Sequence, residues 1–386
     1  MLSISALAAN VWNGIFILAS FLFVLSIVVF IHELGHFLVA RWCGVTVKAF
    51  SLGFGREIYA FVDKHGTRWR LAWLPLGGYV KFMDDENAAS VPSREMLEKM
   101  TPEERAGSFH AKALWQRAAV VAAGPIANFL LAITIFALLY TFIGMRTTEA
   151  RIDEVMPDTP AARAGFKQGD LIVSINGDPM SSFNDVLRIV SVSPDKELVV
   201  KIDRGGTTQT LKVVPESRET SDVPGGTYRR GVIGIKRMTS AQNIVVKKTG
   251  LLEGIALGTK ETGYIITSTL GYLGDVFTGR QKADQLGGPI RIAEISGQVA
   301  RIGIEPLLQL VALISVSVGL INLFPIPLLD GGHLMFYAIE GIRRRPLSER
   351  SQEIGFKIGL AVVLMLMVFA TWNDRLIVWR WVTGAS

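Results

Sequence analysis

The sequence predicts a polytopic α-helical membrane protein with four spans, short membrane-associated β-strands and one inserted β-rich domain. Apolar residues make up 49% of the 386 residues, and the charged residues, 19%, are distributed so unevenly that whole stretches carry none. The mean hydropathy of +0.36 is too high for an average soluble protein and excludes a disordered one. The single cysteine, Cys43, excludes an intramolecular disulfide and a zinc cluster built on cysteines. The net charge of +6 does not indicate nucleic-acid binding, because no basic block alternates with aromatic residues.

Four uncharged stretches are long enough to cross a bilayer, whose hydrocarbon core of about 30 Å requires about 20 helical residues. They cover 1–31, 118–145, 306–329 and, with Lys357 near its start, 354–373. We expect the first to be a retained helix rather than a cleaved signal peptide, because no basic leader precedes it. The uncharged segment 262–274 is too short to cross and favours a helix that lies at the interface.

The basic residues predict the orientation, since short loops rich in Lys and Arg stay in the cytoplasm. Twelve basic residues lie in 41–117 and five in 336–357, where three of them form the run 343–345. Both termini and the long segment 146–305 are therefore expected on the outer side. The expected order is a first helix at 1–40, a cytoplasmic loop with strands at 41–117, a second helix at 118–145, an outer β-rich domain at 146–240, an outer interfacial segment at 241–305, a third helix at 306–335, a cytoplasmic basic loop at 336–353, a fourth helix at 354–373 and an outer tail at 374–386.

The outer segment contains the pattern of a compact β-rich domain. Apolar residues alternate over 171–175 before an Asn-Gly turn, and a helical repeat and two more alternating runs follow up to residue 213. This stretch, with a closing strand at 231–235, resembles a bacterial-type PDZ domain. The resemblance implies a peptide groove between a helix at 182–192 and a strand at 151–155 that contains Ile152 and Val155. A β-rich domain without a ligand is the alternative.

Residues 32–36, His-Glu-Leu-Gly-His, form an HExxH motif at the end of an uncharged run of 31 residues. Histidines four positions apart on a helix lie about 6 Å apart along the axis and about 40° apart around it, so His32 and His36 can bind one metal ion. Glu33 is then the natural general base for a zinc-bound water, whose pKa zinc lowers toward about 7. Ionisable residues at membrane depth are costly unless they are paired, hydrated or metal-bound, which makes an accidental match a poor explanation.

A catalytic zinc also requires a third protein ligand and an open position. Asp330 is the preferred candidate, because the third span, like the first, runs from outside to inside and ends at the same depth. His333, one turn further on, is the alternative ligand or a partner of the ligands. His65 and His110 lie in a polar loop and are expected to be solvated surface residues.

Three further features of the apolar segments bear on the site. Pro325 and Pro327 predict that the third helix unwinds before Asp330 and exposes backbone groups to a cavity, with a kink between packed helices as the alternative. Asn128, a polar amide in the second span, is expected to bond to a neighbouring helix. Alternation at 45–49 and 69–73 predicts two short strands that dip into the membrane and pair with an unwound substrate; an ordinary cytoplasmic hairpin is the alternative.

With these motifs the chain resembles a site-2 protease of the bacterial regulator of sigma-E protease type, a zinc-dependent intramembrane metalloprotease. The resemblance rests on the HExxH motif, the NxxPxPxLDG pattern at 322–331, the PDZ domain between spans two and three, and the segments 76–81 and 287–290. It implies Zn²⁺ bound by His32, His36 and Asp330, with Glu33 as the base. It also implies that Asn322 positions the substrate or stabilises the oxyanion. One clear PDZ copy is present where some members have two.

The expected function is hydrolysis of peptide bonds in the transmembrane segments of single-span membrane proteins, in a bacterial inner membrane with both termini periplasmic. The resemblance implies pre-trimmed anti-sigma factors or signal-peptide remnants as substrates, in regulated intramembrane proteolysis and stress response. The lipid bilayer and a PDZ peptide ligand are expected partners, and nucleic acid is not. Two alternatives stay open: a membrane PDZ scaffold with a structural metal site, which Glu33 disfavours, and a membrane-anchored metallopeptidase that acts on soluble peptides.

Overall fold

The structure is a computed structural model that describes residues 4–84, 100–223, 226–238, 245–280, 283 and 287–375. The chain folds into two compact units. The first unit comprises Met1–Phe136, Gly258–Ile266 and Gly287–Asp374, and the second comprises Ala137–Leu257, Thr267–Leu286 and Arg375–Ser386.

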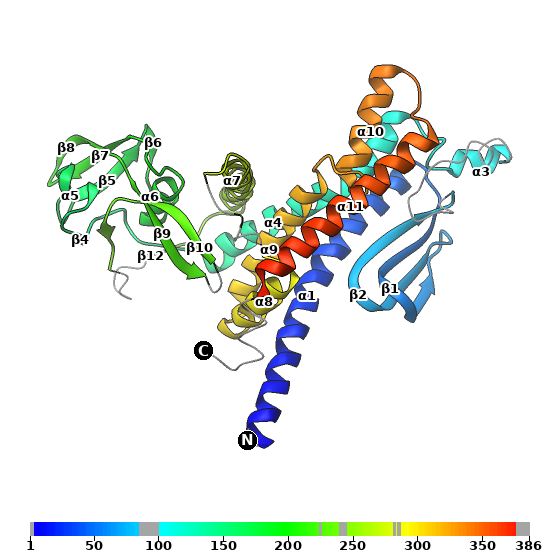
Figure 1. The fold of residues 1–386 in the computed structure, drawn as a ribbon, viewed down its shortest axis with the longest axis horizontal. Coiled ribbons are helices and arrows are strands. Elements are labelled where there is room, and N and C mark those ends of the chain that lie inside the picture. The colour runs from blue at the N-terminus through cyan, green and yellow to red at the C-terminus, as the bar shows by residue number, and fades with distance from the viewer. Residues whose placement is uncertain are drawn as a thin grey trace. The chain divides into compact units, whose positions relative to one another are not determined.

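The first unit is built mainly from helices (Figure 1). Helix α1 packs against α8 and α9, and α8 also contacts α9 and α11. The helices are α1 (Ile4–Trp42), α3 (Pro102–Gly107), α4 (Leu114–Leu138), α8 (Pro289–Ile302), α9 (Ile304–Asn322), α10 (Asp330–Arg343) and α11 (Glu349–Asn373).

Four helices of the described chain are long and apolar enough to cross a membrane, as the sequence predicts. They are the segments Val11–Trp42, Leu114–Ile143, Ile304–Asn322 and Arg350–Asn373, the second of which continues from α4 into the π-helix η1 (Leu139–Ile143). Because these helices contain long uncharged runs, their side chains can face lipid or pack against one another. Helix α7 (Leu251–Phe277), which contains the segment expected at the interface, is not one of the four.

The third span corrects one expectation. The sequence predicts one helix over 306–335, but α9 ends at Asn322 and α10 begins at Asp330. The break contains Pro325 and Pro327, whose rings and missing N–H groups are incompatible with a continuous helix. Leu328, with a φ of 101°, lies in a backbone region that bulky residues rarely adopt. The unwinding predicted from the prolines is therefore present, and it divides the predicted helix in two.

Strands β1 (Val47–Val62) and β2 (Arg68–Phe82) are much longer than the short strands that the sequence predicts. They fold into a curled antiparallel sheet in which residues 49–52 of β1 pair with 68–71 on one side and with 78–81 on the other. Residues 59–62 also pair with 68–71, so the two strands supply four adjacent segments. The segment 78–82 of β2 forms one edge of this sheet, and 57–62 of β1 forms the other. Local alternation marked parts of the strands but not this folding back.

The part of the sheet around Phe50 packs on α1, whereas residues 54–62 and 71–74 carry exposed apolar side chains. Phe50 lies in a buried cluster with Phe37, and its ring centroid is 4.4 Å from that of Trp69. Away from this cluster the exposed side chains are largely hydrophobic. The hydrophobic ones are Phe54, Ile58, Tyr59, Phe61, Val62, Leu71, Trp73 and Leu74. An exposed apolar surface of this kind indicates a contact with lipid or with another protein.

The second unit contains the inserted β-rich domain (Figure 1). Its four-stranded sheet has the order β6-β5-β7-β8, and β11 pairs with β4 in a smaller sheet. Buried Ile172, Val186, Val200 and Ile202 join this sheet to α6 in one hydrophobic core. The elements of the unit other than η1 and α7 are β3 (Met145–Thr147), β4 (Glu154–Val155), α5 (Pro160–Arg163), β5 (Leu171–Ile175), β6 (Asp178–Pro179), α6 (Phe183–Ser191), β7 (Leu198–Arg204), β8 (Thr207–Val213), β9 (Glu216–Val223), β10 (Gly226–Val232), β11 (Ile235–Lys236) and β12 (Val245–Lys247).

A buried ion pair makes the stability of this domain depend on pH. Burial raises the pKa of Asp170, but hydrogen bonds from Arg204 at 2.7 and 2.8 Å and from the Lys167 N–H at 2.8 Å outweigh it and lower that pKa. A lowered pKa in the folded state means that the stabilisation is complete above the unfolded value of about 3.9. We expect it to disappear as the pH falls through the folded pKa.

Replacing Arg204 by Met should therefore destabilise the domain at neutral pH and weaken the stability loss below pH ~4. Pulse proteolysis of the full-length protein in detergent, repeated across that pH range, measures both effects. Lys212→Met is the control, because Lys212 pairs with Glu197 on the exposed surface. Equal pH profiles for wild type and Arg204→Met would contradict the assignment.

Candidate metal centre

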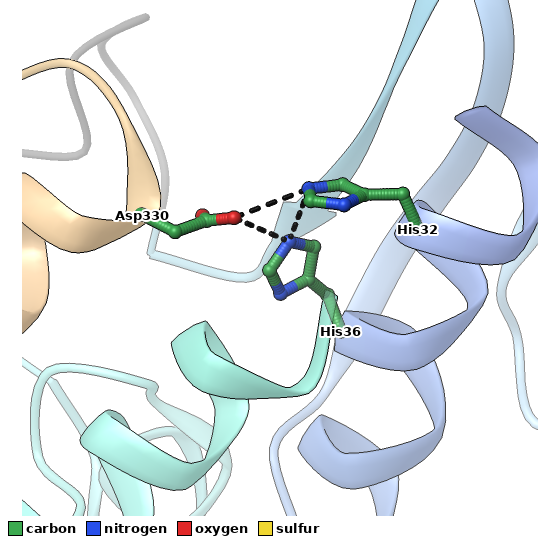
Figure 2. Close-up of side chains that lie close together, drawn as sticks. All are labelled: His32, His36 and Asp330. Carbon is green, nitrogen blue, oxygen red and sulfur yellow. Dashed lines mark hydrogen bonds and ion pairs between the residues drawn. The ribbon is translucent and has the colours of Figure 1, made fainter. Parts of the chain in front are cut away.

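Three side chains from distant parts of the chain converge on one point (Figure 2). His32 and His36 project from the last third of α1, and Asp330 is the first residue of α10. The Nε2 atoms of the two histidines are 3.2 Å apart. Oδ2 of Asp330 lies 3.1 Å from Nε2 of His32 and 3.5 Å from Nε2 of His36. His32 is 8% exposed. The structure thus joins the three residues that the sequence singled out as ligands.

This triangle has the size of one face of a zinc tetrahedron. Zinc bonds of about 2.0–2.1 Å separate tetrahedral ligand atoms by roughly 3.3 Å. Oδ2 of Asp330 is buried and has no hydrogen-bond partner in the described part of the chain. Such a buried acceptor requires a cation or a donor, so the residues present fit a divalent metal with nitrogen and oxygen ligands.

Helix α4 lies directly against the rings of His32 and His36. Nδ1 of His36 lies 2.8 Å from the carbonyl oxygen of Val120, which can only accept a hydrogen bond. The ring therefore carries its proton on Nδ1 and directs a lone pair on Nε2 toward the triangle. A Cβ atom added to Gly124 would collide with the His36 ring and would lie 2.9 Å from Cε1 of His32. Only glycine allows α4 to approach this closely.

The side chain of Glu33 projects from α1 toward the edge of the β1–β2 sheet. Its carboxylate accepts a hydrogen bond from the backbone N–H of Val80 in β2. A Cβ on Gly78 would lie 2.9 Å from Cγ of Glu33 and 2.8 Å from the carbonyl oxygen of Ser51. Gly78 thus lets the sheet edge 78–82 lie directly against the candidate base.

The other candidates on the third span are placed as follows. Asn322 ends α9, eight residues before Asp330, and is half-buried. His333 lies on α10 with its ring centroid 5.3 Å from that of Phe356, and it is not one of the three grouped ligands. Asn128 is fully buried, as expected for a residue that bonds between helices, and its Nδ2 atom lies 3.1 Å from Nδ1 of His32.

The expectation for His110 is wrong, whereas His65 is exposed as expected. The side chain of His110 is 6% exposed, and its Nδ1 lies 2.8 Å from Oδ2 of Asp84. Burial raises the pKa of Asp84, but hydrogen bonds from His110 and Ser108 hold it well below its usual range. The polar composition of the loop did not reveal this partner, which lies 26 residues away.

The candidate peptide groove also requires correction. Ile152 is fully buried in the core, and its N–H donates to the carbonyl of Asp170. Val155 pairs with Ile235 of β11. Within 151–155, the first residues are therefore bonded to 169–171 and the last ones to β11, so this strand already has partners along its length. Among the described residues β11 pairs with β4 alone, so its outer edge is open to an added strand, as are the outer edges of β6 and β8.

Ile152→Asp should consequently unfold the inserted domain rather than alter peptide selection. An unpaired buried carboxylate costs on the order of several kcal/mol, a large part of a domain's stability. Limited proteolysis of the full-length protein measures the loss. Val173→Asp is the matched control, because Val173 lies on β5 with 42% of its surface exposed. A resistant domain in Ile152→Asp would show that the residue is not in the core.

Comparison with known proteins agrees with this geometry. The sequence profile of peptidase family M50 matches residues 20–366. A protein of Rhizobium meliloti (strain 1021) that is named, as a prediction, a zinc metalloprotease is 50% identical over 355 residues, which cover 92% of this chain and 95% of the relative. Metalloprotease MmpA of Caulobacter vibrioides is 40% identical over 92% of this chain and 94% of its own length. Regulator of sigma-E protease RseP of Escherichia coli (strain K12) is 32% identical over 92% of this chain and 98% of its own length.

Proposed function

Because this chain belongs to peptidase family M50, the site-2 protease family, we propose that it cleaves peptide bonds within the transmembrane segments of other membrane proteins. It is a zinc metalloprotease of the site-2 type and an inner-membrane protein. The observation that carries the finer proposal is the triangle of His32, His36 and Asp330, which adjoins the end of one apolar helix and follows another. Membership of a peptidase family argues against the alternative of a membrane PDZ scaffold with a structural metal site.

In this proposal His32, His36 and Asp330 hold the zinc ion, which when bound activates a water molecule and polarises the scissile carbonyl. Glu33 takes the proton from the attacking water and delivers it to the leaving amide nitrogen. The hydrogen bond from the Val80 N–H and the close approach of Gly78 keep the Glu33 carboxylate in place. Asn322 is proposed to position the substrate or to donate to the oxyanion.

The sheet edge 78–82 is the proposed site for unwound substrate. A transmembrane helix hides its scissile carbonyls in its own hydrogen bonds, so it must become extended before attack. Among the described residues, 78–81 pair with β1 on one side only, and Gly78 lies against Glu33. A substrate strand added there would be held extended beside the base. The exposed apolar side chains of the sheet are proposed to contact lipid.

We propose that both termini and the inserted domain are periplasmic, with the basic run 343–345 in the cytoplasm. A peptide groove outside the membrane cannot take part in hydrolysis near the cytoplasmic face, because roughly 20 Å or more of bilayer separates them. It can only select substrates, such as anti-sigma factors already trimmed outside or signal-peptide remnants. The open edge of β11 is the proposed place for a peptide ligand.

Cleavage of labelled single-span proteins by the purified, detergent-solubilised chain tests the proposal. We expect a zinc chelator to stop cleavage and added zinc to restore it, with the cut inside the apolar run of the substrate. Cuts confined to soluble peptides would favour the membrane-anchored peptidase. Cleavage that persists in the chelator would refute the assigned site.

A further inference from the structure

In the described chain, the amide of Asn128 is the hydrogen-bond partner of Nδ1 of His32. The amide atom that faces Nδ1 is the nitrogen, and this orientation is incompatible with metal binding by the ring. Nδ2 of Asn128 lies 3.1 Å from Nδ1 of His32. An amide nitrogen can only donate, so this pairing requires a lone pair on Nδ1. The proton of the neutral ring would then lie on Nε2, which is the atom that faces Asp330 and His36. A protonated Nε2 cannot bind a metal ion.

His36 shows the opposite and compatible arrangement. Its Nδ1 donates to the carbonyl of Val120, which leaves the Nε2 lone pair directed at the triangle. For both rings to bind the same ion, Nδ1 of His32 must also donate to an acceptor. Oδ1 of Asn128 is such an acceptor, and it is buried without a hydrogen-bond partner in the described residues.

We infer that Asn128 is a positioning residue for the metal site, whose Oδ1 accepts the Nδ1 proton of His32 and thereby selects the tautomer that can bind zinc. The inference rests on the proposed function. It requires only a half-turn of the amide, because the planar group has the same shape in both orientations. The turn supplies a partner for Oδ1 and frees the Nε2 lone pair of His32 in a single step.

The backbone and the side chain of Asn128 contact different helices. Gly124, one turn earlier on α4, allows the close approach to α1. On the opposite side, Oγ of Ser315 in α9 donates to the carbonyl oxygen of Asn128 at 2.8 Å. The side chain of Asn128 therefore serves His32, while its backbone serves the packing of α4 against α9.

This division provides a matched set of variants for a test in the full-length protein. Asn128→Leu keeps the approximate volume and removes the acceptor, and Asn128→Asp keeps an acceptor at the same place. Ser315→Ala removes the contact with the Asn128 backbone and leaves the amide intact. Zinc affinity is measured by competition with a chelator, and the protonated nitrogen of His32 is identified by nitrogen-15 NMR of labelled histidine.

We expect Asn128→Leu to weaken zinc binding by about 10- to 100-fold, as loss of a ligand's hydrogen-bond partner typically does. Asn128→Asp should bind zinc at least as tightly as wild type, with the His32 proton on Nδ1. Ser315→Ala should leave zinc affinity unchanged.

A role in packing alone predicts a different result, because a carboxylate buried among three helices would be as harmful as leucine. If Asn128→Asp binds zinc as weakly as Asn128→Leu, or if Ser315→Ala weakens zinc as much, the inference is wrong. A His32 proton on Nε2 in the zinc-loaded wild type would also overturn it. If Asn128→Leu does not fold, the comparison of wild type with Asn128→Asp and the NMR assignment decide alone. Wild-type protein that neither binds zinc nor cleaves substrate would refute the proposed function instead.

Discussion

Glu33→Gln should retain zinc at the wild-type level and lose hydrolysis by about 100- to 10,000-fold, the range typical for removal of a general base. Glutamine keeps the shape of the side chain and can still receive the Val80 N–H through its amide oxygen. It cannot take a proton from water. Glu33 is also not one of the three grouped ligands, so the metal site should be unaffected. Metal analysis and cleavage of one labelled single-span substrate, performed on the same preparation, measure the two properties.

Asp330→Ala provides the contrast for this result. Removal of Oδ2 opens one corner of the triangle, so zinc occupancy and hydrolysis should fall together. Full zinc retention in Asp330→Ala would transfer the ligand role to His333. Substantial hydrolysis by Glu33→Gln, with zinc present, would mean that another group acts as the base.

The grouping of the three candidate ligands could be predicted from the sequence, because the patterns that indicate it are local or follow from the order of the spans. The spacing of His32 and His36 sets two ligands on one helix face, and the uncharged run around them argues against coincidence. Asp330 is about 300 residues away, yet counting spans places it at the same depth as the histidines. The break at Pro325 and Pro327 follows from the chemistry of proline alone.

The parts that could not be predicted depend on contacts that leave no periodic pattern. Alternation shows that a strand has two faces, but not that Ile152 faces the core and bonds to residues 169 and 170. His110 belongs to a polar loop by composition, and only the fold brings Asp84 beside it. The curled sheet forms because residues 49–52 have partners on two sides, which a local pattern does not specify.

Gly124 is a residue of the candidate site that the sequence does not reveal, because a residue without a side chain gives no chemical signal. A Cβ atom on Gly124 would lie within 2.9 Å of both histidine rings, so this position faces both of them. The absence of a Cβ there allows Val120 and Asn128 of the same helix to reach His36 and His32. A glycine inside an apolar span allows the close approach of a neighbouring helix, which at this depth carries ionisable residues.

Gly124→Ala should therefore weaken zinc binding by at least about tenfold and reduce hydrolysis accordingly. Alanine favours a helix over glycine by about 1 kcal/mol, so α4 itself should not be destabilised. The added methyl group would collide with the His36 ring and approach Cε1 of His32 to 2.9 Å, which forces the rings or α4 to move. Either movement opens the triangle of ligand atoms. Zinc affinity by chelator competition is the direct measurement, and circular dichroism reports whether the helices persist.

Gly14→Ala is the matched control for this substitution. Gly14 lies on α1, the helix of the two histidines, and a Cβ there would have no atom within 4 Å. It makes the same chemical change in a helix without touching the site, so zinc affinity and hydrolysis should stay at the wild-type level. If Gly124→Ala binds zinc as tightly as Gly14→Ala, the rings tolerate the methyl group and the close approach of α4 is not required. Loss of zinc in Gly124→Ala alone, with helical content preserved, would show that the ligand geometry depends on a single missing methyl group.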